Sequence, residues 1–151
     1  MRISSSDGTT SEKSSVVLLL VDVINDFDFP TASKLLKHAL PAARKIQALK
    51  RRLSARGIPA VYVNDNFGRW RSDFRKQVER CLSADATGAS AASLLIPAEN
   101  DYFVLKPKHS GFYASSLDVL LKNLLRKERL LAIRTMTKGG EKYDLGAQEP
   151  S

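Results

Sequence analysis

The chain has 151 residues, a formal net charge of +8, and globular proportions of hydrophobic (43%) and charged (26%) residues. This length fits one domain, and the composition argues against disorder along most of the chain. The longest apolar run, Val16–Val21, is far shorter than the roughly 20 residues that span a bilayer. It is also shorter than the apolar core of a secretory signal. We therefore expect no membrane association.

Cysteine and histidine content limits the possible chemistry. Cys81 is the single cysteine, which excludes an internal disulfide and any cysteine-rich zinc site and favours a cytoplasmic location. The two histidines, His38 and His109, leave little material for a histidine-based metal site. We expect no metal and no cofactor.

The first half of the chain predicts a strand, a helix and a second strand. Val16–Val21 is continuous and rich in branched residues, as expected of a strand buried on both faces. Pro41 fits the first position of a helix that runs through Arg56, and Gly57 fits its cap. The apolar run Ile58–Val63 then predicts a second buried strand.

The second half predicts four further segments and a final strand. Ser72 begins an expected helix, Gly88–Leu95 is either a loop or a short helix, and Tyr102–Leu105 is a third strand. Ser115 or Ser116 caps a helix with the clearest amphipathic stripe, and Leu130–Ile133 is a fourth strand. The stripe consists of Leu117, Leu120, Leu121, Leu124 and Leu125.

Alternating strands and helices predict an α/β fold, with a parallel sheet between two helical layers. Because no further periodic segment follows the fourth strand, we expect an incomplete three-layer α-β-α domain of about four strands, spanning residues 16–133. Residues 1–15 and 134–151 are polar and aperiodic, and we expect both segments to be disordered.

Two ionisable residues follow predicted strands directly. Asp22 comes after the first strand and Lys106 after the third. Ligands of open α/β sheets bind at the carboxyl ends of the strands. An acid and an amine meeting there can orient or activate a third group. On pattern alone, Asp22 can equally cap a helix and Lys106 can be solvated.

Three separate segments resemble the isochorismatase-like cysteine hydrolases, a superfamily that includes nicotinamidases and N-carbamoyl amidases. They are VVLLLVDVINDF (Val16–Phe27), IPAVYVNDNFGRW (Ile58–Trp70) and DYFVLKPKHSGFYASSLDVLL (Asp101–Leu121). They occur in the family's order and spacing. The resemblance implies a Rossmann-like α/β fold and hydrolysis of C–N bonds or enol ethers.

The resemblance also implies a catalytic aspartate, lysine and cysteine, and it places the first two on Asp22 and Lys106. In the family the carboxylate takes the thiol proton, and the ammonium favours the thiolate that attacks carbon. We therefore expect these two side chains within hydrogen-bond or one-water distance. The family's cysteine follows the fourth strand, where this chain has RTMTKGG without a cysteine. Thr135 and Thr137 are poor substitutes, because a hydroxyl is far less acidic than a thiol.

Cys81 is a tempting replacement for that nucleophile. It shares an apolar helical face with Phe74, Val78 and Leu82, so we expect an inert core thiol. A metal site also fails, because nicotinamidase-type members place Asp-x-His after the second strand, whereas Asp65 here precedes Asn66 and Phe67. Aromatic residues near the strand ends can wall an apolar substrate pocket, although such residues are as often core. They are Phe27, Trp70 and Phe112.

Three functions from different classes fit these observations. The first is a hydrolase domain that acts on a small molecule and is truncated or altered after its fourth strand. The second is a non-catalytic module that pairs with an intact homologue, and in either case we expect a homo-oligomer. The third is binding of anionic ligands or nucleic acid through the basic stretch 34–56. We rank nucleic acid last, because the stretch lacks interleaved aromatic residues and any known motif.

Overall fold

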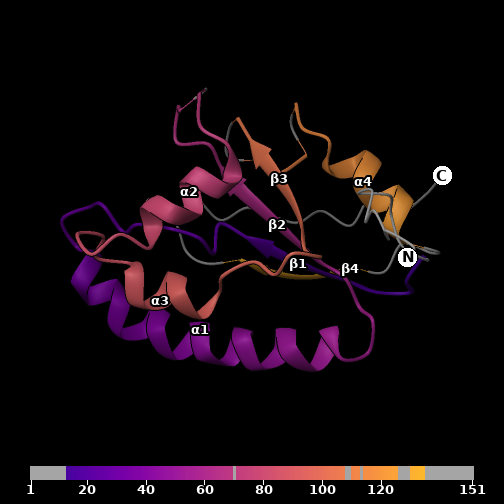
Figure 1. Cartoon of the computed structure of the whole chain (residues 1–151), viewed down its shortest axis with the longest axis horizontal. Helices are drawn as coiled ribbons and strands as arrows, with labels where there is room; N and C mark the ends of the chain where they lie inside the picture. Colours follow the sequence, from indigo (N-terminus) through magenta and orange to yellow (C-terminus); the bar gives the residue numbers. More distant parts are fainter. Residues whose placement is uncertain (1–12, 70, 108–109, 113, 126–129, 135–151) are drawn as a thin grey trace, which may run out of the picture.

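The computed structural model describes residues 13–69, 71–107, 110–112, 114–125 and 130–134, the last of these in their backbone only. Four strands are separated by four helices along this part of the chain, two of them between the second and third strands (Figure 1). In chain order they are β1 (Val17–Val21), α1 (Ala32–Ser54), β2 (Ala60–Asp65), α2 (Phe74–Cys81), α3 (Ala89–Leu94), β3 (Tyr102–Lys106), α4 (Leu117–Leu124) and β4 (Leu130–Arg134).

The four strands form one parallel sheet in the order β3-β2-β1-β4. The central strands β1 and β2 are almost completely buried, which explains why both consist of unbroken apolar runs. Crossover helices connect the parallel strands, as this topology requires. The predicted α/β class, the parallel sheet and the presence of all four strands are confirmed, although β2 begins and ends two residues later than the predicted Ile58–Val63.

Helices cover both faces of the sheet, which gives the predicted three layers (Figure 1). On one face, Leu18, Leu20 and Tyr62 pack with apolar residues of α1, α2 and α3. On the other, Val61 and Val63 pack with the leucine stripe of α4. Because successive side chains of a strand point to opposite faces, each central strand contributes to both cores and fixes the two helical layers against one sheet.

Helix α1 begins nine residues earlier than the sequence predicted. Pro41 is exposed inside the helix and not at its first position, so our prediction of that boundary was wrong. A proline inside a helix removes one backbone hydrogen bond. Packing of Ala32, Leu36 and Leu40 on the core offsets this loss, because tertiary contacts override local propensity. The sheet therefore gains a 23-residue helix along one face.

Gly57 ends α1 as the sequence predicted. Its φ of +69° lies in the left-handed region that favours glycine. The Gly57 N–H donates to the Ser54 carbonyl, and the Ile58 N–H donates to the Leu53 carbonyl. These two bonds form a Schellman motif, which reverses the chain directly into β2.

The starts of α2 and α4 also differ slightly from the sequence reading. Asp73, not Ser72, caps α2, and its side chain accepts a hydrogen bond from the Lys76 N–H. Ser116 occupies the cap position of α4 but makes no side-chain cap bond, whereas Ser115 Oγ accepts from the Leu117 N–H at 3.2 Å. The segment Gly88–Leu95, for which the sequence allows either a loop or a short helix, contains the short helix α3.

Only a few residues of the two segments expected to be disordered, 1–15 and 134–151, are among the described residues. Ser14 lies within the stretch expected to be disordered, yet it forms a parallel bridge with Leu125 and donates to the Leu124 carbonyl at 2.8 Å. Arg134, expected in the tail, belongs to β4. Residues 1–12 and 135–151 lie outside the described residues. Within the described part of the chain, no helix has the length and apolar character needed to cross a bilayer.

Candidate functional site

The site lies at the carboxyl edge of the sheet, where β1, β2 and β3 end side by side. Asp22 directly follows β1, Asp65 ends β2 and Lys106 ends β3. The parallel register places Asp65 beside Lys106. The Asp22 N–H donates to the Val63 carbonyl at 2.8 Å and so ties the end of β1 to β2. The topology alone therefore gathers three charged side chains at one edge.

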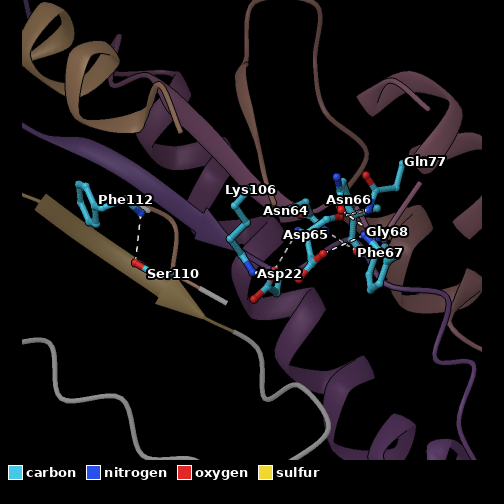
Figure 2. A network of polar contacts seen from close by, with 11 residues as sticks. Asp22, Asn64, Asp65, Asn66, Phe67, Gly68, Gln77, Lys106, Ser110 and Phe112 are labelled. Carbon is cyan, nitrogen blue, oxygen red and sulfur yellow. Dashed lines mark hydrogen bonds and ion pairs between the residues drawn. The ribbon is translucent and has the colours of Figure 1, made fainter. Parts of the chain in front are cut away.

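Lys106 and Asp22 form a buried ion pair (Figure 2). Lys106 Nζ lies 3.0 Å from Asp22 Oδ1, and the exposed fractions of the two side chains are 2% and 3%. The predicted placement of this pair within hydrogen-bond distance is confirmed. On burial each charge loses several kcal/mol of hydration free energy. The attraction of a close partner is about that large, so charges this deeply buried require one.

Asp65 is a third member of the charged group. On the sequence alone, Asp65 was considered only as a metal ligand. Asp65 Oδ2 lies 3.7 Å from Lys106 Nζ, and the Asp65 N–H donates to Asp22 Oδ1 at 3.3 Å. One ammonium is therefore shared by two carboxylates, which gives the three side chains a formal net charge of −1. Asp65 neighbours Lys106 through the observed register of β2 and β3, which strand patterning in the sequence does not give.

Asp22 has a left-handed backbone, with φ of +53°. Residues other than glycine adopt this region at a cost, and such residues concentrate at functional sites. The turn lets the chain leave β1 while the carboxylate stays directed at Lys106 (Figure 2). This conformation is consistent with selection for the position of the carboxylate.

Buried amide side chains support the ends of the strands. The Asn64 Nδ2 donates to the Ile24 carbonyl at 2.6 Å, and Gln77 Nε2 of α2 donates to the Asp65 carbonyl. Asn64 is fully buried, and its Oδ1 atom has no hydrogen-bond partner within the described structure. A buried acceptor without a partner costs free energy of folding. Asn64 therefore brings to the edge of the site a polar group whose hydrogen bonding is incomplete.

Cys81 lies in the core and not at this edge. It is 0% exposed and packs with Phe74 and the residues of α1 and α3. Burial, together with the Asp26 carboxylate, raises the pKa of the Cys81 thiol to about 11, although Arg80 and Arg69 oppose the shift. The prediction of a core thiol is confirmed, because a thiol in this state is neither accessible nor ionised at neutral pH.

The three aromatic residues proposed as pocket walls have different surroundings. Phe27 is 6% exposed, and its ring lies 5.9 Å from Phe29. It also packs against Gly88, where a Cβ atom would come within 2.3 Å of the ring. Phe112 is 51% exposed and lies apart from Asp22 and Lys106 (Figure 2). Trp70 lies outside the described residues, so its role and that of the pocket stay predictions.

The turn after β2 uses its polar groups internally. Asp65 Oδ1 accepts from the Phe67 N–H at 2.8 Å, and Asn66 Oδ1 accepts from the Gly68 N–H at 2.9 Å. Phe67 stands where the Asp-x-His pattern has histidine, and Arg80 lies 5.6 Å from its ring centroid. In the described part of the chain, no group of three or more potential ligands gathers to hold a metal.

A Lys106→Met substitution tests whether the buried ion pair is a structural necessity. We expect it to lower the free energy of unfolding by about 3–5 kcal/mol, because Asp22 would be left buried without its ammonium. Adding Asp22→Asn should recover part of the loss, and urea unfolding measures both effects. The matched control is Lys122→Met, which removes an exposed pair with Asp118 and should change stability by less than about 1 kcal/mol. Equal losses in both variants would contradict the assignment.

Reaction with a thiol reagent tests the burial of Cys81. Because the thiol is buried and its pKa is raised to about 11, we expect dithionitrobenzoate at pH 8 to react at least about 100-fold more slowly with native protein than with unfolded protein. Native and guanidinium-unfolded samples followed at 412 nm provide the comparison. Rapid labelling of the native protein would show that Cys81 is accessible.

Comparisons with known proteins agree with this architecture. The family model of the isochorismatase domain matches residues 16–132. The uncharacterized isochorismatase family protein YaaI of Bacillus subtilis (strain 168) is 33% identical over 112 residues, which cover 74% of this chain and 61% of that protein. The chain thus spans less than two thirds of the length of this curated relative.

Solved structures share the fold. A cysteine hydrolase from Pseudomonas syringae pv. phaseolicola 1448A superposes with a TM-score of 0.53 at 22% identity, covering 81% of this chain and 60% of that one. N-carbamoylsarcosine amidase from Thermoplasma acidophilum gives a TM-score of 0.52 at 25% identity, covering 80% and 68%. Together with the match over residues 16–132, these findings show that the chain belongs to the isochorismatase family.

Proposed function

We propose that this domain supplies the acid–base half of a hydrolytic site that acts on a C–N bond or an enol ether of a small molecule. The observation that carries the proposal is the buried pair of Asp22 and Lys106, 3.0 Å apart at the carboxyl edge of the sheet. A structural ion pair has no need of this edge, whereas the ligands of α/β sheets bind there. The free, buried thiol of Cys81 fits a reducing compartment, and we place the domain in the cytoplasm.

Asp22 and Lys106 have complementary roles in this proposal. Asp22 is the proton acceptor for an attacking thiol, and the Lys106 ammonium stabilises the thiolate as the proton leaves. The second carboxylate, on Asp65, adds a further attraction on the ammonium at 3.7 Å. A charge that is fixed and largely buried before the reaction stabilises developing charge more strongly than mobile water does.

The nucleophile is the component that this sequence does not supply. Cys81 lies in the core, and no other cysteine occurs in the 151 residues. The hydroxyls of Thr135 and Thr137, which lie outside the described residues, are weak nucleophiles without a strong base. We therefore expect the 151-residue chain to show no turnover of amides, N-carbamoyl compounds or enol ethers above background.

Introduced cysteines test the acid–base proposal directly. In a Cys81→Ala background, we substitute Thr135→Cys, Met136→Cys or Thr137→Cys, after the strand that precedes the family's nucleophile. If Asp22 and Lys106 activate a thiol, at least one of these cysteines should have a pKa well below the usual value of about 8.5. The pH dependence of iodoacetamide alkylation measures it, and Asp22→Asn should raise it again.

The control for this experiment is Val119→Cys, on an α4 position that is 62% exposed and should titrate near the usual value. The proposal fails if all three introduced cysteines behave like this control. It fails in a different way if the unmodified chain turns over a substrate and Cys81→Ser abolishes the activity, because Cys81 would then be the nucleophile.

A specific observation also favours the alternative, a module that pairs with a homologue. Within the described residues, β4 pairs with β1 on one side and with no strand on the other. The outer edge of such a strand offers unpaired N–H and C=O groups that another chain can bind. We propose that the chain uses this edge to associate, either with a second copy or with an intact relative.

Light scattering tests this association. We expect the molar mass to rise above the monomer value of 16.7 kDa as concentration increases from 1 to 100 µM, because strand pairing between chains obeys mass action. Mixing with the intact relative YaaI distinguishes mixed from self-association by a new species in size exclusion. A strict monomer across this range, with no mixed species, would contradict the alternative and leave the hydrolytic proposal unaffected.

A further inference from the structure

The outward side of α1 carries seven exposed basic residues and no acidic one. Taking 100° per residue, they fall within an arc of about 140°, on the side opposite the buried residues Ala43 and Ile46. The last of them follows the helix in its terminal turn. We name this set the α1 basic face: Lys34, Lys37, Arg44, Lys45, Arg51, Arg52 and Arg56.

The charges of the α1 basic face are not neutralised within the described part of the protein. None of the seven residues takes part in an ion pair there, whereas Lys50, on the flank of the same helix, pairs with Asp101. Helix α3, which packs against α1, contains no ionisable residue (ASAASL). From Phe29 to Asn64 the sequence has no acid at all. The face therefore presents an uncompensated positive potential to solvent.

This arrangement does not serve the stability of the helix. Lys34 and Lys37 lie near the amino end of α1, where the helix dipole disfavours cations, and the first turn has no acidic residue. Arg52 and Arg56 are four positions apart, a spacing at which like charges repel. Basic residues in the last turn are favourable, yet they account for only part of the face. An external anion gives a reason for the whole set.

The shape of the face indicates an extended anion. Helix α1 is 23 residues long, about 34 Å at 1.5 Å per residue, and it forms the outermost layer on its side of the molecule (Figure 1). Lys37, Arg44 and Arg51 are spaced seven residues apart, about 10.5 Å along the axis. A single phosphate can contact only one or two of these positions. A polymer of phosphates can contact the whole row.

The neutral side chains of α1 argue against two other anionic ligands, a lipid bilayer and single-stranded nucleic acid. The large exposed hydrophobic residues of the described chain all lie outside α1: Phe67, Ile96, Phe103, Phe112 and Val119. The helix therefore offers no large exposed apolar side chain to enter a bilayer. It also has no Phe, Tyr or Trp ring on which single-stranded bases can stack, and His38 is its one imidazole. Binding to the duplex backbone requires neither, because phosphate contacts supply its affinity.

We propose that the α1 basic face binds the phosphate backbone of double-stranded nucleic acid without reading its sequence. The sequence alone placed nucleic acid last, because the basic stretch has no interleaved aromatic residues. The structure changes this ranking, because it places seven basic residues on one exposed and unpaired face. The proposal does not depend on the hydrolytic site, which lies at the carboxyl edge of the sheet.

Fluorescence anisotropy with a labelled 24-base-pair duplex of mixed sequence tests the proposal. With about five phosphates neutralised, log K should fall with log salt at a slope of about −4.5, roughly 500-fold between 50 and 200 mM. The triple variant Lys37→Gln/Lys45→Gln/Arg52→Gln should reduce the slope by about 3. Glutamine retains helix propensity, and circular dichroism checks that the variant is folded. DNA and RNA duplexes are tested in parallel arms to identify the preferred form.

The matched control is Arg71→Gln/Arg75→Gln/Lys76→Gln, which removes three exposed charges from the segment around α2. It lowers the net charge by the same amount as the triple variant. Because its three residues lie outside the α1 basic face, it should leave the salt slope nearly unchanged. Equal weakening by both variants would show attraction to net charge alone and overturn the proposal. Absence of duplex binding at 50 mM salt would also overturn it. So would binding to vesicles with 30% phosphatidylserine but not to duplex, which would assign the face to membranes.

Discussion

The candidate site depends on one buried ammonium. Lys106, at the end of β3, lies 3.0 Å from Asp22 and 3.7 Å from Asp65, which follow β1 and end β2. A lysine that is 2% exposed can keep its charge only if carboxylates replace the water it has lost. The ammonium therefore requires these three strand ends to stay in register. Asp22 makes this contact from a left-handed backbone, a conformation that costs free energy in a residue other than glycine.

The fold could be predicted from the sequence because its two main signals, the apolar strand runs and the polar residues that directly follow them, are local. The runs Val16–Val21 and Ile58–Val63 are apolar without alternation, a pattern typical of parallel strands covered on both faces. Asp22 and Lys106 could be placed together because parallel strands bring their carboxyl ends to one edge. The order of the elements brought the two residues to one edge, whereas the expectation that they pair came from the resemblance to the hydrolase family.

The errors arose where tertiary packing decides the outcome. Pro41 is a good first helical residue, but packing of Leu36 and Leu40 against the core extends α1 in front of it. Asp65 was overlooked as a partner of Lys106, because a contact between the ends of β2 and β3 depends on their exact pairing. Helical periodicity and strand patterning carry no information about such contacts between separate elements.

The two groups of charges in the chain follow opposite physical rules. At the sheet edge, charges are buried, and each carboxylate is within reach of the Lys106 ammonium. On α1, seven cations are exposed, where water solvates each of them and no partner is needed for folding. Loss of one member of the first group destabilises the structure whatever its chemistry, so the proposed catalytic role has to be separated from the structural one by the reactivity of a thiol. The second group is dispensable to the structure, so any loss of binding on neutralising it reports directly on function.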